Sequence, residues 1–461
     1  MLRQVVFILS FFLTTAAYGQ QWFPLGTGLE HPFSQDTNVA VMFVDTVDNS
    51  LYVAGIFKSI NGVPANNIAR WDGQQWHALG NGIDTTVLSI RCITRFNGDI
   101  YVGGHFYSFS GQRYNHIARW DGQQWHNVGG GVDGPAPVVL TMCEYQNSLY
   151  VGGRYSDASG IIYSGSIMRW DGQQWHPVGD SLGGVGEVSS LCVIHDTLVM
   201  AGAFAAIQTD TGSFPANSVA GWDGQHWITM GNGLSSYANA MTIHNGELYA
   251  GGPFVFPGNR VVRWDGQDWQ PVGTGIDDGY VLCLTSYNGN LIAGGQFFNA
   301  GGNRVGFIAQ WDGQNWSDIG GGMRSSFSLV YPQVFAVQEY GGRLYTGGFF
   351  GYAGNVRCSR IAVWPTPVGI EESIDTGSVS FSVFPNPASD VLVFHGSDEA
   401  SVPQQIILRD ALGRIVRKES VAQYNSWYQI NVAALPEGFY TYEITDHNHL
   451  RQTGRVVVQH P

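Results

Sequence analysis

The chain has few charged residues and more acidic than basic ones. Charged residues make up 13% of its 461 positions, and 22 Lys and Arg against 36 Asp and Glu give a net charge of −14. A nucleic-acid footprint would be basic, so this balance argues against one. Beyond the first 19 residues, no apolar run approaches the length of a transmembrane helix.

Several local catalytic motifs are also missing. The sequence has no Walker-type phosphate loop, no His-Glu-x-x-His and no close Cys or His pair with metal-site spacing. An active site assembled from single residues far apart in the chain is not excluded by this. No catalytic residue is assigned, and no cofactor is predicted beyond a possible structural divalent cation.

Glycine, in contrast, is abundant, and it accompanies a repeated hexapeptide. There are 62 Gly residues, about twice the average usage. The hexapeptide Trp-Asp-Gly-Gln-Gln-Trp or a close variant recurs every 42 to 52 residues, a period that predicts a propeller or a solenoid. Its copies are Trp71–Trp76, Trp120–Trp125, Trp170–Trp175, Trp222–Trp227, Trp264–Trp269 and Trp311–Trp316.

Each hexapeptide is predicted to be the tip of a β-hairpin. Asp72 and Gly73 suit the positive φ angles of a tight turn, and apolar residues flank both sides. Whether the loop has two residues or four, Trp71 and Trp76 point to the same side of the sheet. We interpret the pair as core rather than as an exposed platform for sugar rings.

The full repeat contains four short strands. In the second copy these are Val87–Thr94, Ile100–Gly104, the strand that ends at Trp120 and the strand that starts at Trp125. With tight turns at each corner they predict one antiparallel blade.

The two ends of the repeat array complement each other. Gln20–Gly26 is a fourth strand without a third, and Ser359–Trp364 is a third strand without a fourth. Pairing them gives seven blades and leaves no free edge. The prediction is therefore an all-β, seven-bladed β-propeller over residues 20–364, closed by its N-terminal strand.

The connections at one end of this ring vary in length and sequence. Binding residues concentrate on such connections, so we expect a glycan or protein partner there or at the channel mouth. Four of these connections carry an acid after an aliphatic residue, and a partial ring of carboxylates suits a divalent cation or sugar hydroxyls. The acids are Glu30, Asp84, Asp133 and Asp277, where other blades have Ser235 or Arg324. Acids in Gly-rich turns are also ordinary turn formers.

Histidine and cysteine are interpreted as structural. His77, His126 and His176 follow the second Trp of their hairpins, one per blade, so they are expected to lie solvated on outer strands. Four cysteines occupy first strands and are expected to be buried free thiols. They are Cys92, Cys143, Cys192 and Cys283, while Cys358 has no evident partner.

The repeat resembles a kelch-type propeller. The resemblance rests on a Gly-Gly doublet that ends the second strand, as at Gly103-Gly104, and on the Trp-Asp-Gly hairpin that follows. It also resembles bacterial and fungal surface propellers with an Ala-x-Trp-Asp-Gly-x-x-Trp repeat. Both resemblances imply a fold and are nearly silent on function, because such propellers include binders and oxidases.

Residues 1–19 have the features of a secretory signal peptide. Arg3 is followed by the apolar run Val5–Leu13 and by the small-x-small site Ala17-Tyr18-Gly19. Cleavage is predicted between Gly19 and Gln20. The mature chain is therefore expected to be exported and to lack a transmembrane segment.

After Trp364 the composition changes. Residues 365–377 predict a polar linker. Residues 378–461 contain seven short alternating strands, which predict an Ig-like β-sandwich.

This tail resembles the C-terminal sorting domain of the type IX secretion system of Bacteroidota. The resemblance implies recognition by the secretion machinery, and an extracellular protein that is released or anchored at the outer-membrane surface. Its matching residues include Pro385, Asn386, Pro387, Asp390, Gly413, Arg414, Gly438 and Tyr440.

The sequence therefore predicts a two-domain exported protein whose propeller is a binding module. Two alternatives stay open. One is an extracellular propeller enzyme that acts on polysaccharide, and the other is a structural component of a surface layer.

Overall fold

The described part of the chain consists of β-strands and turns. The computed structural model describes residues 21–30, 37–83, 89–162, 166–179, 182–183, 186–209, 212–326, 330–365, 381–384, 388, 390–396, 403–410, 414–421, 427–436, 438–446 and 451–458. These ranges contain no α-helix, so the all-β prediction is confirmed for them. Internal contacts divide them into two compact units, one within Gly19–Pro367 and one within Val368–Pro461.

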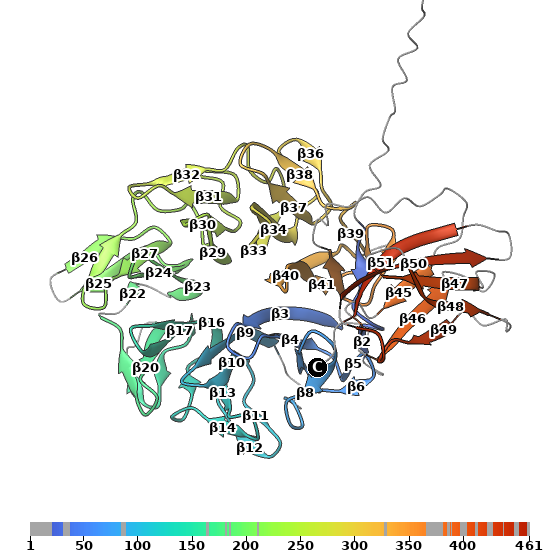
Figure 1. Cartoon of the computed structure of the whole chain (residues 1–461). Helices are drawn as coiled ribbons and strands as arrows, with labels where there is room; N and C mark the ends of the chain where they lie inside the picture. The colour runs from blue at the N-terminus through green and yellow to red at the C-terminus, as the bar shows by residue number, and fades with distance from the viewer. Residues whose placement is uncertain are drawn as a thin grey trace, which may run out of the picture. The chain divides into compact units, whose positions relative to one another are not determined.

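The larger unit contains seven four-stranded antiparallel sheets among its described residues, here called blades 1 to 7. The sheets radiate outward from their first strands, as Figure 1 shows, which is the architecture of a β-propeller. Blade 1 is β3 (Asn38–Asp45), β4 (Ser50–Ile56), β7 (Ile68–Trp71) and β8 (Trp76–Ala78); blade 2 is β9 (Ser89–Phe96), β10 (Asp99–His105), β13 (Ile117–Trp120) and β14 (Trp125–Asn127); blade 3 is β16 (Val138–Tyr145), β17 (Ser148–Arg154), β20 (Ile167–Trp170) and β21 (Trp175–Pro177). Blade 4 is β23 (Glu187–Ile194), β24 (Thr197–Ala203), β27 (Val219–Trp222) and β28 (Trp227–Thr229); blade 5 is β29 (Ala240–His244), β30 (Glu247–Gly251), β31 (Val261–Trp264) and β32 (Trp269–Pro271); blade 6 is β33 (Tyr280–Tyr287), β34 (Asn290–Gln296), β37 (Ile308–Trp311) and β38 (Trp316–Asp318); blade 7 is β40 (Gln333–Tyr340), β41 (Arg343–Phe349), β44 (Ile361–Trp364) and β1 (Phe23–Pro24).

Blade 7 combines the beginning and the end of this unit. Its outer strand β1 pairs antiparallel with β44, and Phe23 lies opposite Val363. The first strands of neighbouring blades contact one another in chain order from β3 to β40, and β40 also contacts β3. Residues from both ends of the repeat array thus share one sheet.

The Trp hairpins have four-residue loops. Trp71 pairs with Trp76, so Asp72–Gln75 is the loop. Gly73 has a φ of +98°, which suits a residue without a side chain, whereas Asp72 does not adopt a positive φ. The carboxylate of Asp72 instead accepts hydrogen bonds of 2.8 Å from the backbone N–H groups of Gln74 and Gln75.

The Trp residues pack in or against the core, as predicted, and several of them, such as Trp71 and Trp120, are half-buried at its edge. The ring centroids of Trp71 and Trp76 are 5.2 Å apart on one side of the hairpin. The second Trp of several hairpins also donates an indole hydrogen bond to a carbonyl at the end of the preceding blade's fourth strand. Such bonds join Trp125 to Leu79, Trp175 to Val128, Trp316 to Val272 and Trp22 to Ile319.

Small sheets occupy the connections that the sequence predicted to be variable loops. A two-residue strand before a blade pairs with a short hairpin between the second and third strands of the same blade. The three-stranded examples are β2 (Leu29–Glu30) with β5 (Ser59–Ile60) and β6 (Val63–Pro64), β15 (Val132–Asp133) with β18 (Asp157–Ala158) and β19 (Ile161–Ile162), β22 (Leu182–Gly183) with β25 (Ala206–Thr209) and β26 (Gly212–Pro215), and β39 (Met323–Arg324) with β42 (Tyr352–Ala353) and β43 (Val356–Arg357). The two-stranded hairpins are β11 (Ser108–Phe109) with β12 (Gln112–Arg113) and β35 (Asn299–Ala300) with β36 (Asn303–Arg304).

The smaller unit consists of two antiparallel sheets. Their strands correspond in order to the seven that the sequence predicted, and one buried cluster that includes Leu392, Phe394 and Ile406 joins them. The first sheet is β45 (Phe381–Phe384), β46 (Val391–Gly396) and β49 (Trp427–Asn431); the second is β48 (Ile415–Ser420), β47 (Pro403–Arg409), β50 (Gly438–Asp446) and β51 (Arg451–Val458).

Candidate functional site

The predicted acidic residues that the structure describes, Glu30, Asp133 and Asp277, lie at the end of the propeller that carries the small sheets. Glu30 ends β2 and accepts a 3.0 Å hydrogen bond from the hydroxyl of Ser59. Asp133 ends β15 and accepts one of 2.8 Å from the N–H of Gly134. All these carboxylates are exposed. Each acid therefore bonds within its own blade.

The other two predicted acids are Asp277 and Asp84. Asp277 accepts a 2.8 Å hydrogen bond from the N–H of Gly302, again within one blade. Asp84 lies outside the described residues. Within the described ranges no three His, Cys, Asp or Glu side chains are grouped to hold a metal ion. The structure thus does not bring Glu30, Asp133 and Asp277 into one metal-binding group, because each serves its own turn.

Exposed hydrophobic side chains concentrate at this same end. Phe256 and Tyr331 are each 62% exposed, and Val255 is 59% exposed. Tyr331 packs edge-on against Phe298, with 5.5 Å between ring centroids. These residues were not predicted from the sequence, although the exposed run Val255-Phe256-Pro257 is a signal for them. The full set here is Tyr107, Tyr237, Val255, Phe256, Tyr280, Val330 and Tyr331.

Residues with a left-handed backbone anchor these connections to the blades. The residue before each third strand has a φ between +64° and +74° and is not glycine. Asn67 is an example, since its amide donates a 2.8 Å hydrogen bond to the carbonyl of Ile83 and accepts one of 3.0 Å from the N–H of Phe57. The equivalent residues are His116, Ser166, Ser218, Arg260, Phe307 and Arg360.

His116 differs from the others at this position. It is fully buried, neither ring nitrogen has a hydrogen-bond partner in the described structure, and its ring stacks on that of His105 at 5.7 Å. Burial first, and then the neighbouring His105, lowers its pKa to about 4. A neutral His116 therefore acts as a packing residue at neutral pH.

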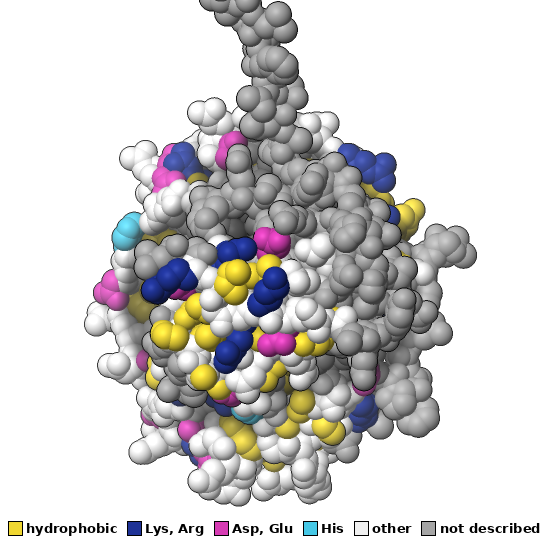
Figure 2. Space-filling view, turned by 45° about the vertical axis from the view of Figure 1, so that its right-hand side comes forward, with side chains coloured by type: hydrophobic (Ala, Val, Ile, Leu, Met, Phe, Trp, Pro, Cys, Tyr) yellow, Lys and Arg dark blue, Asp and Glu magenta, His cyan; other side chains and the backbone are white. Residues whose placement is uncertain are grey.

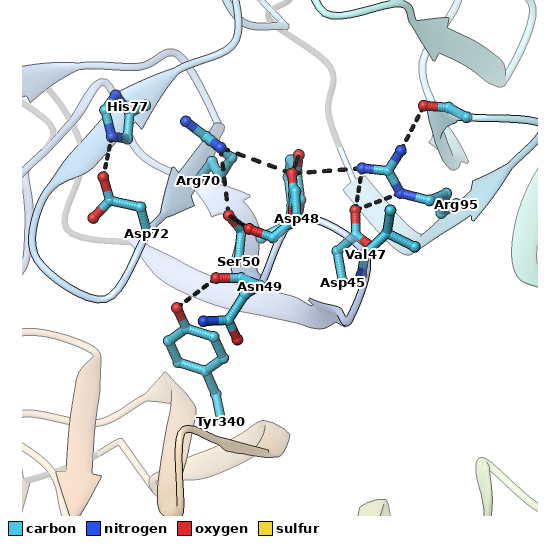
Figure 3. A network of polar contacts seen from close by, with 12 residues as sticks. Asp45, Val47, Asp48, Asn49, Ser50, Arg70, Asp72, His77, Arg95 and Tyr340 are labelled. Atoms are coloured by element: carbon cyan, nitrogen blue, oxygen red, sulfur yellow. Dashed lines mark hydrogen bonds and ion pairs between the residues drawn. The ribbon is translucent and has the colours of Figure 1, made fainter.

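The opposite end carries the Trp hairpins, where the predicted solvated histidines have partners. Nε2 of His77 lies 2.6 Å from Oδ2 of Asp72 (Figure 3). His126 with Asp121 and His176 with Asp171 repeat this contact at 2.7 Å, and Gln270 replaces His opposite Asp265. These histidines lie on the outer strands β8, β14 and β21, and their side chains are 28–34% exposed, which agrees with the predicted outer-strand positions. Their carboxylate partners were not predicted, because it is the four-residue loop that brings the residue after the second Trp back to the turn carboxylate.

A polar network at this end joins blades 7, 1 and 2. The buried carboxylate of Asp45 pairs with Arg95 of blade 2, and Asp48 lies 3.5 Å from the same guanidinium (Figure 3). The hydroxyl of Tyr340 donates a 2.7 Å hydrogen bond to the carbonyl of Asn49. Burial alone would lower the pKa of Arg95, but Asp45 and Asp48 outweigh it and raise that pKa. The network fixes the blade junctions rather than forming an open site.

One further motif needs its structural context. Residues 179–183 read Gly-Asp-Ser-Leu-Gly, which has the Gly-x-Ser-x-Gly spacing of a nucleophile elbow. An elbow places its Ser between a strand and a helix, whereas here the last two residues of the motif form the two-residue strand β22. Ser181 itself lies outside the described residues. The motif does not have the context of an elbow.

Charges on the surface are mixed. On the face drawn in Figure 2, Lys and Arg side chains stand beside Asp and Glu side chains, with hydrophobic ones between them. That described surface shows no large patch of one sign.

Half of the predicted sorting residues are described. The carbonyl of Asp390 accepts hydrogen bonds from the N–H groups of Val432 and Ala433, at 2.8 and 3.2 Å. The guanidinium and N–H of Arg414 both bond to the carboxylate of Asp410, at 2.7 and 2.9 Å.

The other two described sorting residues lie on β50. Gly438 begins the strand with a φ of +149°, and the hydroxyl of Tyr440 donates a 2.7 Å hydrogen bond to the carbonyl of Pro436. All four described sorting residues thus have structural roles in this unit. The predicted site residues that lie outside the described ranges are Gly19, Gln20, Pro385, Asn386, Pro387 and Gly413, together with most of the linker 365–377.

Two family models match separate parts of the chain. Residues 382–459 match the secretion system C-terminal sorting domain. Residues 48–71, in blade 1, match a β-propeller domain of unknown function. The sorting domain, which belongs to type IX secretion, indicates export to the cell surface or the medium. No curated protein matches the chain, and no helix among the described residues is long and apolar enough to cross a membrane.

Solved structures with similar folds share little sequence with this chain. The extracellular domain of a proposed one-component system from B. thetaiotaomicron has 11% identity and a TM-score of 0.44, with 96% of this chain and 58% of that chain covered. The Dos1 propeller has 11% identity and a TM-score of 0.41, with 82% and 92% covered. The computationally designed Ika8 protein has 13% identity and a TM-score of 0.33, with 94% and 99% covered. The chain spans less than two thirds of the first of these proteins.

Proposed function

We propose that this protein is an exported binding protein, either anchored at the cell surface or released. A closed, seven-bladed, kelch-like propeller over residues 20–364 recognises a glycan or a protein. A signal peptide over residues 1–19 starts export, and an Ig-like sorting domain over residues 378–461 then directs secretion across the outer membrane. The sorting domain is afterwards either removed or retained. The proposal needs no resident cofactor.

Contacts across blade 7 support the closed ring. β1 completes the sheet of β44, Trp22 donates a 3.1 Å hydrogen bond to the carbonyl of Ile319 in blade 6, and Tyr340 bonds to Asn49 in blade 1. These are the contacts that other blades make with their neighbours, as Trp316 does with Val272 and Tyr145 with Asp196. In such a ring the remaining edges are the short outer strands of the blades.

The observation that carries the binding proposal is the asymmetry of exposed hydrophobic side chains. Of the exposed large hydrophobic residues of the described propeller, seven lie at the end with the small sheets. Only Phe23, Val47, Ile228 and Ile243 lie elsewhere. Exposed aromatic residues on rigid connections are typical of recognition surfaces.

A ligand screen on the full mature chain tests this proposal. We expect an oligosaccharide, a polysaccharide or an extracellular protein to raise the unfolding temperature by binding the native state. Phe256→Ser and Tyr331→Ser should weaken this shift, whereas Val47→Ser and Ile228→Ser, at other exposed positions, should leave it unchanged. A shift that survives both aromatic variants would contradict the assignment of the surface.

The same screen separates the alternatives. Released sugar in the wells would favour a polysaccharide-acting enzyme, and concentration-dependent association of the purified chain would favour a surface-layer component. A shift that requires Ca²⁺ and is lost in Glu30→Gln, Asp84→Asn, Asp133→Asn or Asp277→Asn would identify those acids as ligands.

Export is tested separately. In a host with a type IX secretion system, the full chain should reach the surface or the medium, and a chain that ends at residue 377 should be retained. Equal export of both chains would contradict the role of the tail.

A further inference from the structure

The third strands of four blades carry an Arg just before the first Trp of the hairpin. Each Arg lies opposite a Tyr of the second strand, as Arg169 lies opposite Tyr150. In three blades the guanidinium has a carboxylate partner: Arg70 lies 3.7 Å from Asp48, Arg119 pairs with Asp99, and Arg263 lies 2.5 Å from Glu247.

Blade 3 has no carboxylate at either of the positions that serve the other blades. Gln146 stands where blade 1 has Asp48, and Ser148 stands where blade 2 has Asp99. The guanidinium of Arg169 donates a 3.2 Å hydrogen bond to the hydroxyl of Ser148 and has no ion pair among the described residues. The half-buried positive charge is therefore not neutralised by its own blade, in contrast to Arg70 in Figure 3.

A pocket of about 190 Å³ opens at this guanidinium, between blades 3 and 4. Gln146, Tyr150 and Arg169 line it from blade 3, and Trp222 and Gly224 line it from the hairpin of blade 4. Trp222 is 7% exposed, and its indole N–H has no hydrogen-bond partner. Trp71 and Trp170 share that unpartnered N–H, so the feature that distinguishes this junction is the uncompensated Arg169.

Among the lining side chains, the guanidinium of Arg169 is the one that carries a positive charge. The guanidinium is a planar fork that matches a carboxylate in two parallel hydrogen bonds. The side-chain amide of Gln146 already donates to the hydroxyl of Tyr145, at 2.9 Å, and to the carbonyl of Asp223, at 3.3 Å, which holds it at the pocket wall.

We propose that this Arg169 pocket binds a carboxylate group, presented by an acidic sugar or by a free carboxylic acid. The ligand carboxylate takes the place that Asp48 and Asp99 fill in blades 1 and 2. The pocket lies at the hairpin end of the propeller, and the proposed recognition surface lies at the end with the small sheets. Binding at one of them is therefore independent of binding at the other.

Titration of the full mature chain with sodium glucuronate, sodium acetate and glucose, followed by calorimetry, tests the proposal. Glucuronate should bind with one site, and glucose should not. Arg169→Gln should weaken binding about tenfold or more, as expected for loss of a charge-assisted pair. Arg119→Gln, the matched variant in blade 2, should leave glucuronate affinity unchanged.

Two further variants keep the test independent of folding defects. Ser148→Asp supplies the missing carboxylate and should abolish binding while keeping the unfolding temperature. Asp99→Ser removes the partner of Arg119 and should create a second site. If glucuronate binds and acetate does not, the ligand is an acidic sugar. If both bind with equal affinity, the pocket recognises a free carboxylic acid. Absence of carboxylate binding to the native chain, or binding that survives both Arg169→Gln and Ser148→Asp, overturns the proposal.

Discussion

The indole rings of Trp22 and Trp364 pack against each other with centroids 5.1 Å apart, although one residue precedes the first blade and the other ends the last repeat. Their geometry is that of the Trp pair inside a single hairpin, such as Trp71 and Trp76 at 5.2 Å. Trp22 is 1% exposed and also bonds to Ile319 of blade 6. A residue from the N-terminal strand thus packs as the second Trp of each hairpin does, and it makes the same indole hydrogen bond as Trp125, Trp175 and Trp316.

This equivalence predicts that Trp22→Ala is as costly as Trp316→Ala. Both side chains are at most 2% exposed, and both donate an indole hydrogen bond, of 3.1 and 3.0 Å, to the preceding blade. Each substitution should lower the free energy of unfolding by about 3–5 kcal/mol. Equilibrium unfolding in denaturant measures this. A nearly neutral Trp22→Ala beside a costly Trp316→Ala would show that the ring is not closed by β1.

Much of the blade structure was predictable from local signals. Asn97 and Gly98 mark the turn between β9 and β10, and alternating apolar residues mark the strands themselves. The Trp-Asp-Gly hairpin was predictable because turn chemistry and strand pairing there involve only six consecutive residues.

Features that depend on distant pairing were not predictable. The two-residue strand Leu29–Glu30 has no periodicity to detect, and its partner Ser59–Ile60 lies about one strand pair further along the chain. The left-handed backbone at Phe307 contradicts the preference of that residue type, because the blade geometry overrides it. The pocket at Arg169 arises only when Gly224 of the next blade packs beside it.

The hairpin carboxylates predict a loss of stability in acid. The N–H of Gln124 first, then His126 and the N–H of Gln123, hold the pKa of Asp121 well below its usual value, and Asp171 has the same contacts. Because the folded-state pKa lies below the unfolded-state value of about 3.9, the stabilisation is present above that pH and is lost as the pH falls toward the folded-state pKa.

Unfolding midpoints measured from about pH 7 down to about pH 2.5 check this prediction. Asp121→Asn should lower the midpoint at neutral pH and flatten its fall in acid. Asp133→Asn at the other end of the propeller is the control. If Asp121→Asn leaves the acid limb as steep as in the parent chain, the hairpin contacts do not carry the effect.

We expect the five cysteine thiols to be free and to react slowly in the native chain. All five are unpaired, and burial raises the pKa of Cys143 to about 11 and those of Cys192 and Cys358 to about 12. Cys92 and Cys283 are also buried, and burial raises their pKa values as well. Since the thiolate is the reactive form, a disulfide reagent at about pH 8 should react slowly with the native chain and fully after denaturation. Fewer than five thiols in denaturant without reductant would indicate a disulfide.

Substitution of Asn67 measures how much the contacts that hold the connection before a third strand contribute to stability. It is 4% exposed, adopts a φ of +73°, and its amide bonds to the N–H of Phe57 and the carbonyl of Ile83. Asn67→Ala should cost about 2–4 kcal/mol, because it leaves both buried groups unpaired and places a Cβ-bearing residue without compensation in a left-handed conformation.

Asn67→Gly separates these two causes. Glycine loses the same amide bonds but tolerates the backbone angle, so this variant should be more stable than Asn67→Ala by about 1 kcal/mol. Denaturant unfolding of both variants gives the difference directly. Equal stability of the two would mean that the connection relaxes to another backbone conformation, and the small sheets at this end would then be too loosely held to present a rigid recognition surface.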